Sequence, residues 1–366
     1  MSTKSMKICV VLGTRPEIIK MSPLIHTFRE KGDDYFILHT GQHYSYEMDK
    51  VFFEELGLPP AKYNLDVGSR SHGAMVGYLL ERIEQIYLTE KPDVTLVQGD
   101  TNTVLAGALA ASKIGVKIGH VEAALRSYDR TMPEEINRVL TDHISDFLFI
   151  PTEKAKQIAL GEGIAESKCF VVGNTIVDAA LRNKEVAEKK STALERLGLN
   201  KGGYFLVTSH RAENVDHKEK LAGLLEGFKR VSEKYALPVV YPIHPRAKKM
   251  IAQFGLPVPD CVNLTDPVSY LDFLQLQQHA KLVMSDSGGV QEEACILRVP
   301  TITLRENTER PETIDVGANM LVGTDPARIL KGAETMLAKP RDWKNPFGDG
   351  NTAKKIRDIL VKHLGK

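Results

Sequence analysis

The chain has 366 residues, which is too long for one ordinary hydrophobic core and suits two domains. Its content of 42% hydrophobic and 26% charged residues is typical of a water-soluble globular protein. Because the formal net charge is only +1, no overall field would attract nucleic acid or an anionic membrane, and an anion must bind at a local site.

The first half of the chain alternates strand and helix patterns. The short apolar run at its start, from Ile8 to Leu12, is too short for a signal peptide or a membrane span. Strands are predicted at Lys7–Gly13, Tyr35–Thr40, Val94–Gln98, Lys117–Val121, Phe147–Pro151 and Cys169–Val172. Pro16 fits the first turn of the helix that follows the first strand. Continuous apolar strands joined by helices indicate a parallel sheet covered on both faces.

The second half repeats this scheme after a charged segment, Arg182–Lys201, which we interpret as a solvated helix and a link. A helix is predicted at Leu221–Lys234, and an amphipathic one from about Thr352 to Leu364, which could pack back on the first domain. Strands are predicted at Tyr204–Thr208, Val239–Pro242, Val262–Leu264, Leu282–Ser285 and Thr301–Leu304. The fold class is therefore α/β, with two Rossmann-like doubly wound domains facing a cleft. Their expected extents are 1–173 and 174–350, with 351–366 as a terminal helix.

The four cysteines lack the close spacing of a zinc site or a redox pair. They stand among apolar neighbours, so buried free thiols are expected at Cys9, Cys169, Cys261 and Cys295. Free thiols suit a reducing compartment, and we expect a cytoplasmic protein.

Ligands of doubly wound sheets bind beyond the carboxyl ends of the strands, so residues just after each strand carry the functional information. After the strand Leu282–Ser285, the glycines Gly288 and Gly289 open a helix whose free N–H groups could bind phosphate. Ser287 could cap this helix or donate to a phosphate, and Glu293, one turn further, could accept the hydroxyls of a ribose. A tight turn with a capped helix is the plainer alternative, but the glutamate favours a nucleotide.

Basic residues follow other strands. Arg15 and Lys20 flank a helix start and could both reach one polyanion, although Lys20 alone is better explained as a solvated side chain. Arg310 could neutralise a diphosphate or pair with a neighbouring acid, Glu306 or Glu312.

Two histidines also follow strands in the second half. His210 could bind phosphate or protonate a leaving group. His244 alone is better explained as a structural loop histidine.

Acidic residues gather in the first half. Asp100 and Glu122 end neighbouring predicted strands, where an acid has no obvious packing role. Glu134 is as easily a helix cap as a catalyst, because Thr131 three residues earlier would complete a capping box. Acids in one domain and phosphate-binding groups in the other suit proton abstraction from a sugar whose leaving group is a nucleoside diphosphate.

Seven motifs in order give a resemblance to a known family. They are Gly-Thr-Arg-Pro-Glu-Ile-Ile-Lys, Gln-Gly-Asp-Thr, His-Val-Glu-Ala, Pro-Glu-Glu-Ile-Asn-Arg, Ser-His-Arg-Ala-Glu-Asn, Ser-Asp-Ser-Gly-Gly-Val-Gln-Glu-Glu and Thr-Glu-Arg-Pro. This set, which runs from Gly13 to about Gly323, resembles the non-hydrolysing UDP-N-acetylglucosamine 2-epimerases, which have the GT-B fold. Each motif alone is weak, but the ordered set is specific.

The resemblance implies interconversion of UDP-N-acetylglucosamine and UDP-N-acetylmannosamine without metal or nicotinamide. UDP would be eliminated across C1–C2 to give 2-acetamidoglucal and would then add back. The resemblance implies a homodimer and assigns the catalytic roles to Asp100, Glu122, Glu134 and His210. It also assigns contacts with the UDP-sugar to three of these residues, Asp100, Glu122 and His210, and to Arg15, Lys20, Phe273, Ser287, Gly288, Gly289, Glu293 and Arg310. Phe273, placed beside the uracil, would otherwise be interpreted as a core aromatic residue.

The chain departs from the bacterial members of this family at three places. The stretch Ser127–Met132 is shorter, Ala212 replaces an arginine, and the segment 42–48 differs. These segments belong to the activating second UDP-N-acetylglucosamine site of bacterial members, which Gln42, Arg211 and His244 could still form. The short loop and Ala212 resemble archaeal members.

Four alternatives remain open at this point. A GT-B glycosyltransferase would share the fold and the UDP site but would need an acceptor groove. A hydrolysing epimerase would release free N-acetylmannosamine, and a 2-epimerase of a diacetamido-uronate sugar would need a cation for the extra carboxylate. A non-catalytic UDP-sugar sensor would not need the three acids Asp100, Glu122 and Glu134.

Overall fold

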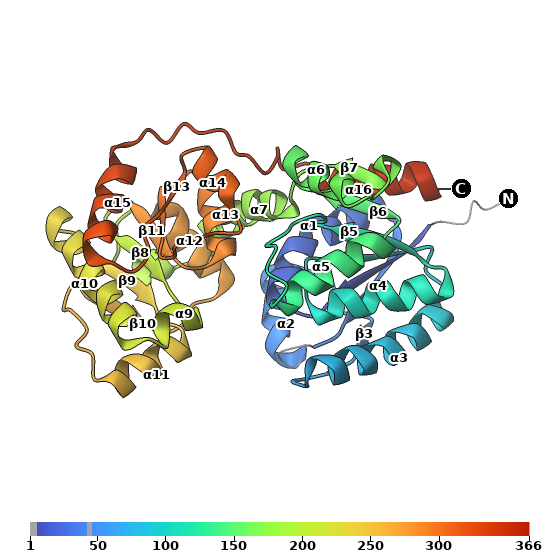
Figure 1. Ribbon diagram of the computed structural model, residues 1–366, viewed down its shortest axis with the longest axis horizontal. Coiled ribbons are helices and arrows are strands. Elements are labelled where there is room, and N and C mark those ends of the chain that lie inside the picture. The colour runs from blue at the N-terminus through green and yellow to red at the C-terminus, as the bar shows by residue number, and fades with distance from the viewer. Residues whose placement is uncertain (1–5, 42–45, 366) are drawn as a thin grey trace. The chain divides into compact units, whose positions relative to one another are not determined.

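The computed structural model describes residues 6–41 and 46–365 (Figure 1). The chain divides into two compact α/β units. Unit 1 comprises Met1–Ala179 and Phe347–Lys366, and unit 2 comprises Ala180–Pro346. The first division falls inside α7 (Thr175–Lys190), a few residues beyond the expected boundary. Asp178, in the part of α7 that belongs to unit 1, accepts a hydrogen bond from the backbone N–H of Ala353.

Unit 1 is built on a parallel sheet with the strand order β3-β2-β1-β4-β5-β6-β7. Its strands are β1 (Lys7–Leu12), β2 (Asp34–His39), β3 (Tyr63–Asn64), β4 (Val94–Gln98), β5 (Lys117–Val121), β6 (Phe147–Ile150) and β7 (Cys169–Val171). Six of these confirm the sequence predictions, whereas β3 was missed because two residues carry no recognisable pattern. The sheet switches direction of winding between β1 and β4, where ligands of this fold class bind.

The helices of unit 1 cover this sheet, and a central core cluster joins residues such as Cys9 and Val97 of the sheet to Leu79 and Ile83. They are α1 (Arg15–Lys31), α2 (Tyr46–Glu55), α3 (His72–Glu90), α4 (Asn102–Ile114), α5 (Pro133–Ile144), α6 (Glu153–Gly161) and α16 (Thr352–Leu364). The terminal helix α16 packs against α1, where Arg357 forms a two-pronged ion pair with Asp33 at 2.6 and 2.8 Å.

Unit 2 is a second parallel sheet with the strand order β10-β9-β8-β11-β12-β13. The strands are β8 (Phe205–Thr208), β9 (Val239–Pro242), β10 (Val262–Thr265), β11 (Leu282–Ser285), β12 (Thr301–Thr303) and β13 (Asn319–Leu321). The first five confirm the predictions, and the three-residue β13 was missed. The helices are α8 (Ala193–Arg196), α9 (Ala212–Val215), α10 (Lys218–Tyr235), α11 (Pro245–Phe254), α12 (Tyr270–His279), α13 (Gly288–Ile296), α14 (Pro311–Asp315) and α15 (Pro326–Ala338).

The cysteines are free thiols, of which Cys261 is half-buried and Cys9, Cys169 and Cys295 are buried. Within the described parts of the chain, no helix has the length and apolarity needed to cross a membrane.

Candidate active site

Two acids of unit 1 lie at the carboxyl ends of adjacent strands, as the sequence predicts. Gln98 at the end of β4 is in register with Val121 at the end of β5, so Asp100 and Glu122 both follow at the same edge of the sheet. Glu122 is buried and its carboxylate accepts hydrogen bonds from Lys20 Nζ at 2.5 Å and from Gln98 Nε2 at 3.1 Å. The interpretation of Lys20 as a solvated side chain is therefore wrong: it is buried, because α1 directs it at Glu122.

Asp100 forms an ion pair with Arg138 of α5, and its side chain is 32% exposed. Asn137, the preceding residue of α5, donates from its side chain to the carbonyl oxygen of Asp100 at 2.9 Å. Arg138 also contacts Glu135 at 2.8 Å. Helix α5 thus holds both the backbone and the carboxylate of Asp100, and sequence reasoning missed this although Arg138 closes the Pro-Glu-Glu-Ile-Asn-Arg motif.

Glu134, the third predicted acid, is half-buried in the first turn of α5. The expected capping box is wrong, because the N-cap of α5 is Met132, and Thr131 donates its hydroxyl to Asp129 at 2.6 Å instead. Pro133 fixes the helix start one residue later than the capping box requires. Glu134 is left in the helix N-terminal turn, where the helix dipole favours a carboxylate.

Arg15 begins α1 and is held by residues of α2. Its Nε lies 3.3 Å from Asp49 Oδ1, and its guanidinium lies 4.8 Å from the centre of the Phe52 ring. Asp49 is buried, and its other carboxylate oxygen lies 3.3 Å from His39 Nε2. Arg15 is therefore fixed at the end of β1, next to the point where the sheet switches direction. Gln42 lies outside the described residues.

A buried carboxyl that the sequence analysis did not identify, Glu17, joins two strand-end loops. It accepts hydrogen bonds from the backbone N–H groups of Gly13 at 2.5 Å and Thr14 at 3.0 Å, and from the Thr101 hydroxyl at 2.6 Å. Burial raises the pKa of Glu17 to about 7, although the hydrogen bonds from Thr101, Gly13 and Thr14 oppose this.

In unit 2, the predicted phosphate loop starts α13 after β11. Ser287 is the N-cap residue, but its side chain makes no capping hydrogen bond, and Gly289 faces open space where a Cβ would meet no atom within 4 Å. The first N–H groups of the helix have no partner within the helix, which makes this end suited to an anion. Glu293 is buried and accepts a hydrogen bond from the Tyr270 hydroxyl at 2.9 Å, which orients its carboxylate.

Arg310 lies just before α14 and pairs with Glu292 of α13, with Nε 2.7 Å from Oε1. Of the pairings considered from the sequence, one with Glu306 is wrong, because Glu306 pairs with Arg328 at 2.9 Å. The Arg310 and Glu292 side chains are mostly buried, so the guanidinium is held close to the start of α13.

His210 lies at the end of β8, and the buried Asp286 at the end of β11 positions it. Asp286 accepts from the backbone N–H groups of His210 and Arg211, each at 3.1 Å, and from the Ser209 hydroxyl at 2.7 Å. The rings of His210 and His244 lie 5.6 Å apart. His210, predicted for the UDP-sugar site, and His244, predicted for the second, activating site, are therefore close neighbours.

Charge and burial distinguish these two histidines. The side chain of His210 is 40% exposed, and its Nδ1 lies 3.4 Å from Asp286. Burial, and then the charge of His210, lowers the pKa of His244, whose Nδ1 accepts the backbone N–H of Arg246 as the N-cap of α11.

The other predicted residues of unit 2 lie around this group. Arg211 is 3.5 Å from Glu309, which also accepts from Arg305. Burial alone would raise the pKa of Glu309, but Arg305 and Arg211 lower it to about 2. Phe273 is half-buried against a core cluster that includes Tyr204 and Leu206, so part of its ring is accessible.

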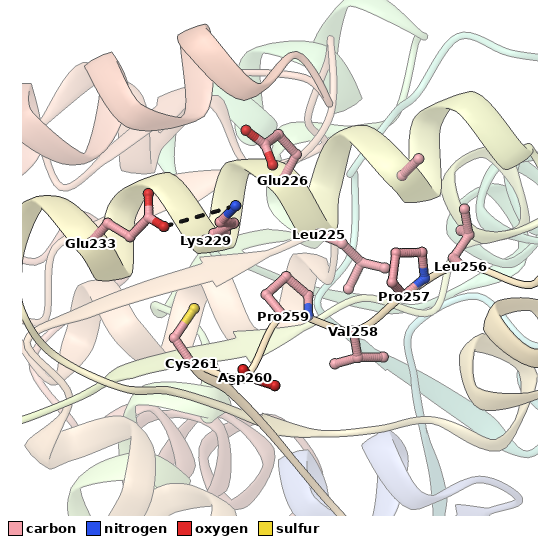
Figure 2. Close-up of a pocket in the computed structure, with 11 residues that line it drawn as sticks. Leu225, Glu226, Lys229, Glu233, Leu256, Pro257, Val258, Pro259, Asp260 and Cys261 are labelled. Atoms are coloured by element: carbon pink, nitrogen blue, oxygen red, sulfur yellow. Dashed lines mark ion pairs between the residues drawn. The ribbon is translucent and has the colours of Figure 1, made fainter.

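A separate cavity of about 520 Å³ lies between α10 and the loop that leads into β10. Figure 2 shows its apolar wall, formed by Leu225, Pro257 and Val258, and the ion pair between Lys229 and Glu233 at its side. Because Cys261 directly precedes β10, this cavity lies toward the amino ends of the strands, and none of the predicted site residues lines it.

Comparison with known proteins assigns the chain to a family. The sequence model of the UDP-N-acetylglucosamine 2-epimerase family matches residues 26–361. Curated UDP-N-acetylglucosamine 2-epimerases of Methanocaldococcus jannaschii and Methanococcus maripaludis are 56% and 55% identical to it, each over 97% of this chain and over 99% and 98% of the relative.

The crystal structure of the Methanocaldococcus jannaschii enzyme in complex with UDP-GlcNAc and UDP is 55% identical, with a TM-score of 0.88 over 98% of this chain and 100% of that one. These matches confirm the fold class and the resemblance to archaeal members. The chain belongs to the UDP-N-acetylglucosamine 2-epimerase family.

Proposed function

We propose that this protein interconverts UDP-N-acetylglucosamine and UDP-N-acetylmannosamine by inverting C2. The observation that carries the proposal is the placement of Asp100 and Glu122 at the ends of adjacent strands, each with a basic partner. Its family membership supplies the substrate class, because relatives more than half identical are named for this activity.

The proposed reaction begins when one carboxylate of unit 1 removes the proton from C2. The C–H electrons form the C1=C2 bond, the bond from C1 to the diphosphate oxygen breaks, and UDP leaves with that electron pair. A second acid returns a proton to the opposite face of C2 while UDP adds back to C1. Two faces require more than one group, which explains a set of three acids, Asp100, Glu122 and Glu134.

Basic and hydrogen-bonding groups would hold UDP and stabilise the charge that develops on it. We assign this role to Arg15, Lys20, His210, Arg310, Ser287, Gly288 and Gly289. The partly accessible ring of Phe273 would contact the uracil, and Glu293, oriented by Tyr270, would accept the ribose hydroxyls. The ion pair with Lys20 would keep Glu122 ionised.

Incubation with UDP-N-acetylglucosamine in D2O, followed by NMR, tests the proposal. We expect deuterium at C2 and a UDP-linked manno product. Release of free sugar would indicate a hydrolysing enzyme, and transfer to an added acceptor a glycosyltransferase. If neither this substrate nor its diacetamido-uronate analogue exchanged the C2 proton, the proposal that the protein is a 2-epimerase would be contradicted.

We propose that two copies of the chain associate through α5. Ile136 and Leu140, one turn apart on this helix, are 41% and 47% exposed, whereas its polar residues Asn137 and Asp142 are buried. A helix that exposes apolar side chains on one face and buries its polar ones is expected to have that apolar face covered by a partner. Analytical ultracentrifugation should show a dimer that I136D/L140D converts to a monomer, while V361D, at an exposed apolar residue of α16, leaves the dimer intact.

Two further predictions concern setting and regulation. The free thiols favour a reducing compartment, so we place the enzyme in the cytoplasm, which fractionation of the source cells would test.

A second UDP-N-acetylglucosamine site at Gln42, Arg211 and His244 stays a prediction. It requires that UDP-N-acetylglucosamine raise the rate of the reverse reaction and that R211A remove this activation.

A further inference from the structure

A buried histidine, His120, lies between the two strand ends that carry Asp100 and Glu122. Its ring belongs to β5, two residues before Glu122, and is almost fully buried. Its Nδ1 lies 2.6 Å from Asp142 Oδ1, and its Nε2 lies 2.8 Å from the carbonyl oxygen of Gly99. The mechanism proposed above does not use this residue.

Both ring nitrogens of His120 face hydrogen-bond acceptors. A carboxylate and a carbonyl oxygen accept but do not donate, and a neutral imidazole has only one N–H group. Only the imidazolium, with a proton on each nitrogen, makes both hydrogen bonds. The short distances on both sides therefore assign His120 as a doubly protonated, positively charged ring.

The surroundings of His120 balance this buried charge. Asp142 of α5 also pairs with Arg126 at 2.7 Å, and Arg126 continues to Glu162 at 2.6 Å. His120 and Arg126 lower the pKa of Asp142 against the effect of burial. Two cations thus alternate with two carboxylates, which is the arrangement that makes a buried charge tolerable.

The two hydrogen bonds of His120 connect it to the backbone just before Asp100 and, through Asp142, to the backbone just after Glu122. Gly99, whose carbonyl oxygen His120 holds, directly precedes Asp100. Asp142, which His120 also holds, accepts the backbone N–H of Ala124 at 3.1 Å, two residues after Glu122. Glu122 and Ala124 have φ angles of 65° and 64°, in the left-handed region that residues with a Cβ rarely adopt.

Strained backbone of this kind persists only where the surrounding contacts impose it. Here those contacts come from Asp142, whose orientation depends on His120 and Arg126. A small shift of this segment would move the Glu122 carboxylate out of line with the reacting carbon.

We infer that His120 is a positioning residue whose imidazolium locks the backbone of Asp100 and of Glu122 in one arrangement. This inference rests on the proposed function, since it assigns the two carboxylates to proton transfer at C2. His120 itself is too deeply buried to touch the substrate, and it acts through Gly99 and Asp142.

Two substitutions separate the two hydrogen bonds. The amide nitrogen of asparagine can take the place of Nδ1, and that of glutamine the place of Nε2. H120N would therefore keep the bond to Asp142 and lose the one to Gly99, whereas H120Q would do the reverse. H120A would lose both, and H217Q, at an exposed histidine of unit 2, is the matched control.

We expect H120N and H120Q each to lower kcat for C2 exchange roughly ten- to hundredfold, with H120A lower still, because small misplacements of catalytic groups have effects of this size. KM and the Kd for UDP should change less than twofold, and H217Q should match the wild type. Unchanged kcat in all three variants would overturn the inference. So would an equal loss of UDP affinity, because it would show general damage.

A second measurement is independent of activity. In the wild-type protein, ¹⁵N NMR of labelled histidine should show a ring signal with both nitrogens protonated. This signal should be missing from the spectrum of H120Q, which identifies it as that of His120. A neutral His120 would overturn the inference even if the enzyme is active. A doubly protonated His120 in a protein without C2 exchange would instead refute the proposed function and confine the residue to a structural role.

Discussion

Two candidate acids and one candidate arginine of the site each pair with an oppositely charged side chain that is distant in sequence. Lys20 contacts Glu122, Arg138 contacts Asp100, and Arg310 contacts Glu292. The strand-end positions of Asp100 and Glu122 could be predicted from the sequence, because the pattern marks where each strand ends. Their partners could not, because the pairing depends on how separate helices pack.

D100N should abolish C2 exchange and retain UDP binding. The amide cannot accept the C2 proton, whereas the assigned UDP contacts involve other residues. NMR exchange in D2O and calorimetric titration with UDP measure the two properties separately. A variant that loses UDP affinity instead would make Asp100 a binding residue.

R310A should weaken UDP binding by about tenfold or more, because it removes a cation assigned to the diphosphate. It also leaves the buried Glu292 without this partner, which would itself destabilise the fold. The double variant R310A/E292Q removes that penalty, so a persistent loss of UDP affinity in it reports on the cation. R328A, at an exposed arginine paired with Glu306, should bind UDP like the wild type. An unchanged Kd for R310A would remove it from the site.

Glu17 should make stability depend on pH in a direction opposite to that of a salt-bridged acid. Its pKa in the folded state is about 7, above its ordinary value of 4.5, so the unfolded chain loses this proton first as pH rises. Its contribution to the free energy of unfolding is therefore present below pH 4.5 and is lost between about 4.5 and 7. E17Q does not titrate, and its amide oxygen can still accept the backbone N–H groups of Gly13 and Thr14.

Urea unfolding at pH 4 and pH 8 measures the free energy of unfolding of both proteins. The value for E17Q relative to the wild type should rise by up to roughly 3 kcal/mol from pH 4 to pH 8. E195Q, at an exposed glutamate of unit 2, is the control and should show no such change. A constant difference between E17Q and the wild type would show that folding does not change the pKa of Glu17.

At the scale of elements, the sequence predicted most strands and the helices that cover them. The bounds of β4, β5, β9 and β11 match the predictions, because buried parallel strands form continuous apolar runs. The two missed strands, β3 and β13, have two and three residues and pair at the sheet edges. The start of α5 was misplaced because Pro133, rather than the hydroxyl of Thr131, determines it.

The terminal helix α16 belongs energetically to unit 1. Ile356 is fully buried on this helix, whereas Val361 is 40% exposed. I356A should lower the free energy of unfolding by about 2–5 kcal/mol, and V361A should change it by less than about 0.5 kcal/mol. Limited proteolysis of I356A should cut unit 1 while leaving 180–346 intact. Preferential cutting within 180–346 would contradict this assignment.

At the scale of the whole molecule, each unit has its own sheet and its own hydrophobic core. The acids assigned to proton transfer belong to unit 1, and most of the groups assigned to UDP belong to unit 2. The alternation of strands and helices allowed this division to be predicted from the sequence. The network around His120 could not be, because it joins β5, α5 and the end of α6 through side chains that no local pattern marks.

Unit 2 is one continuous segment, whereas unit 1 is completed by the last twenty or so residues of the chain. During synthesis, residues 180–346 leave the ribosome before α16 does. All residues of unit 2 are therefore translated before α16, whereas unit 1, although translated first, keeps the surface of α1 that packs against α16 uncovered until residues 352–364 have been made. The unit that is translated first is thus the one whose last structural element is translated last.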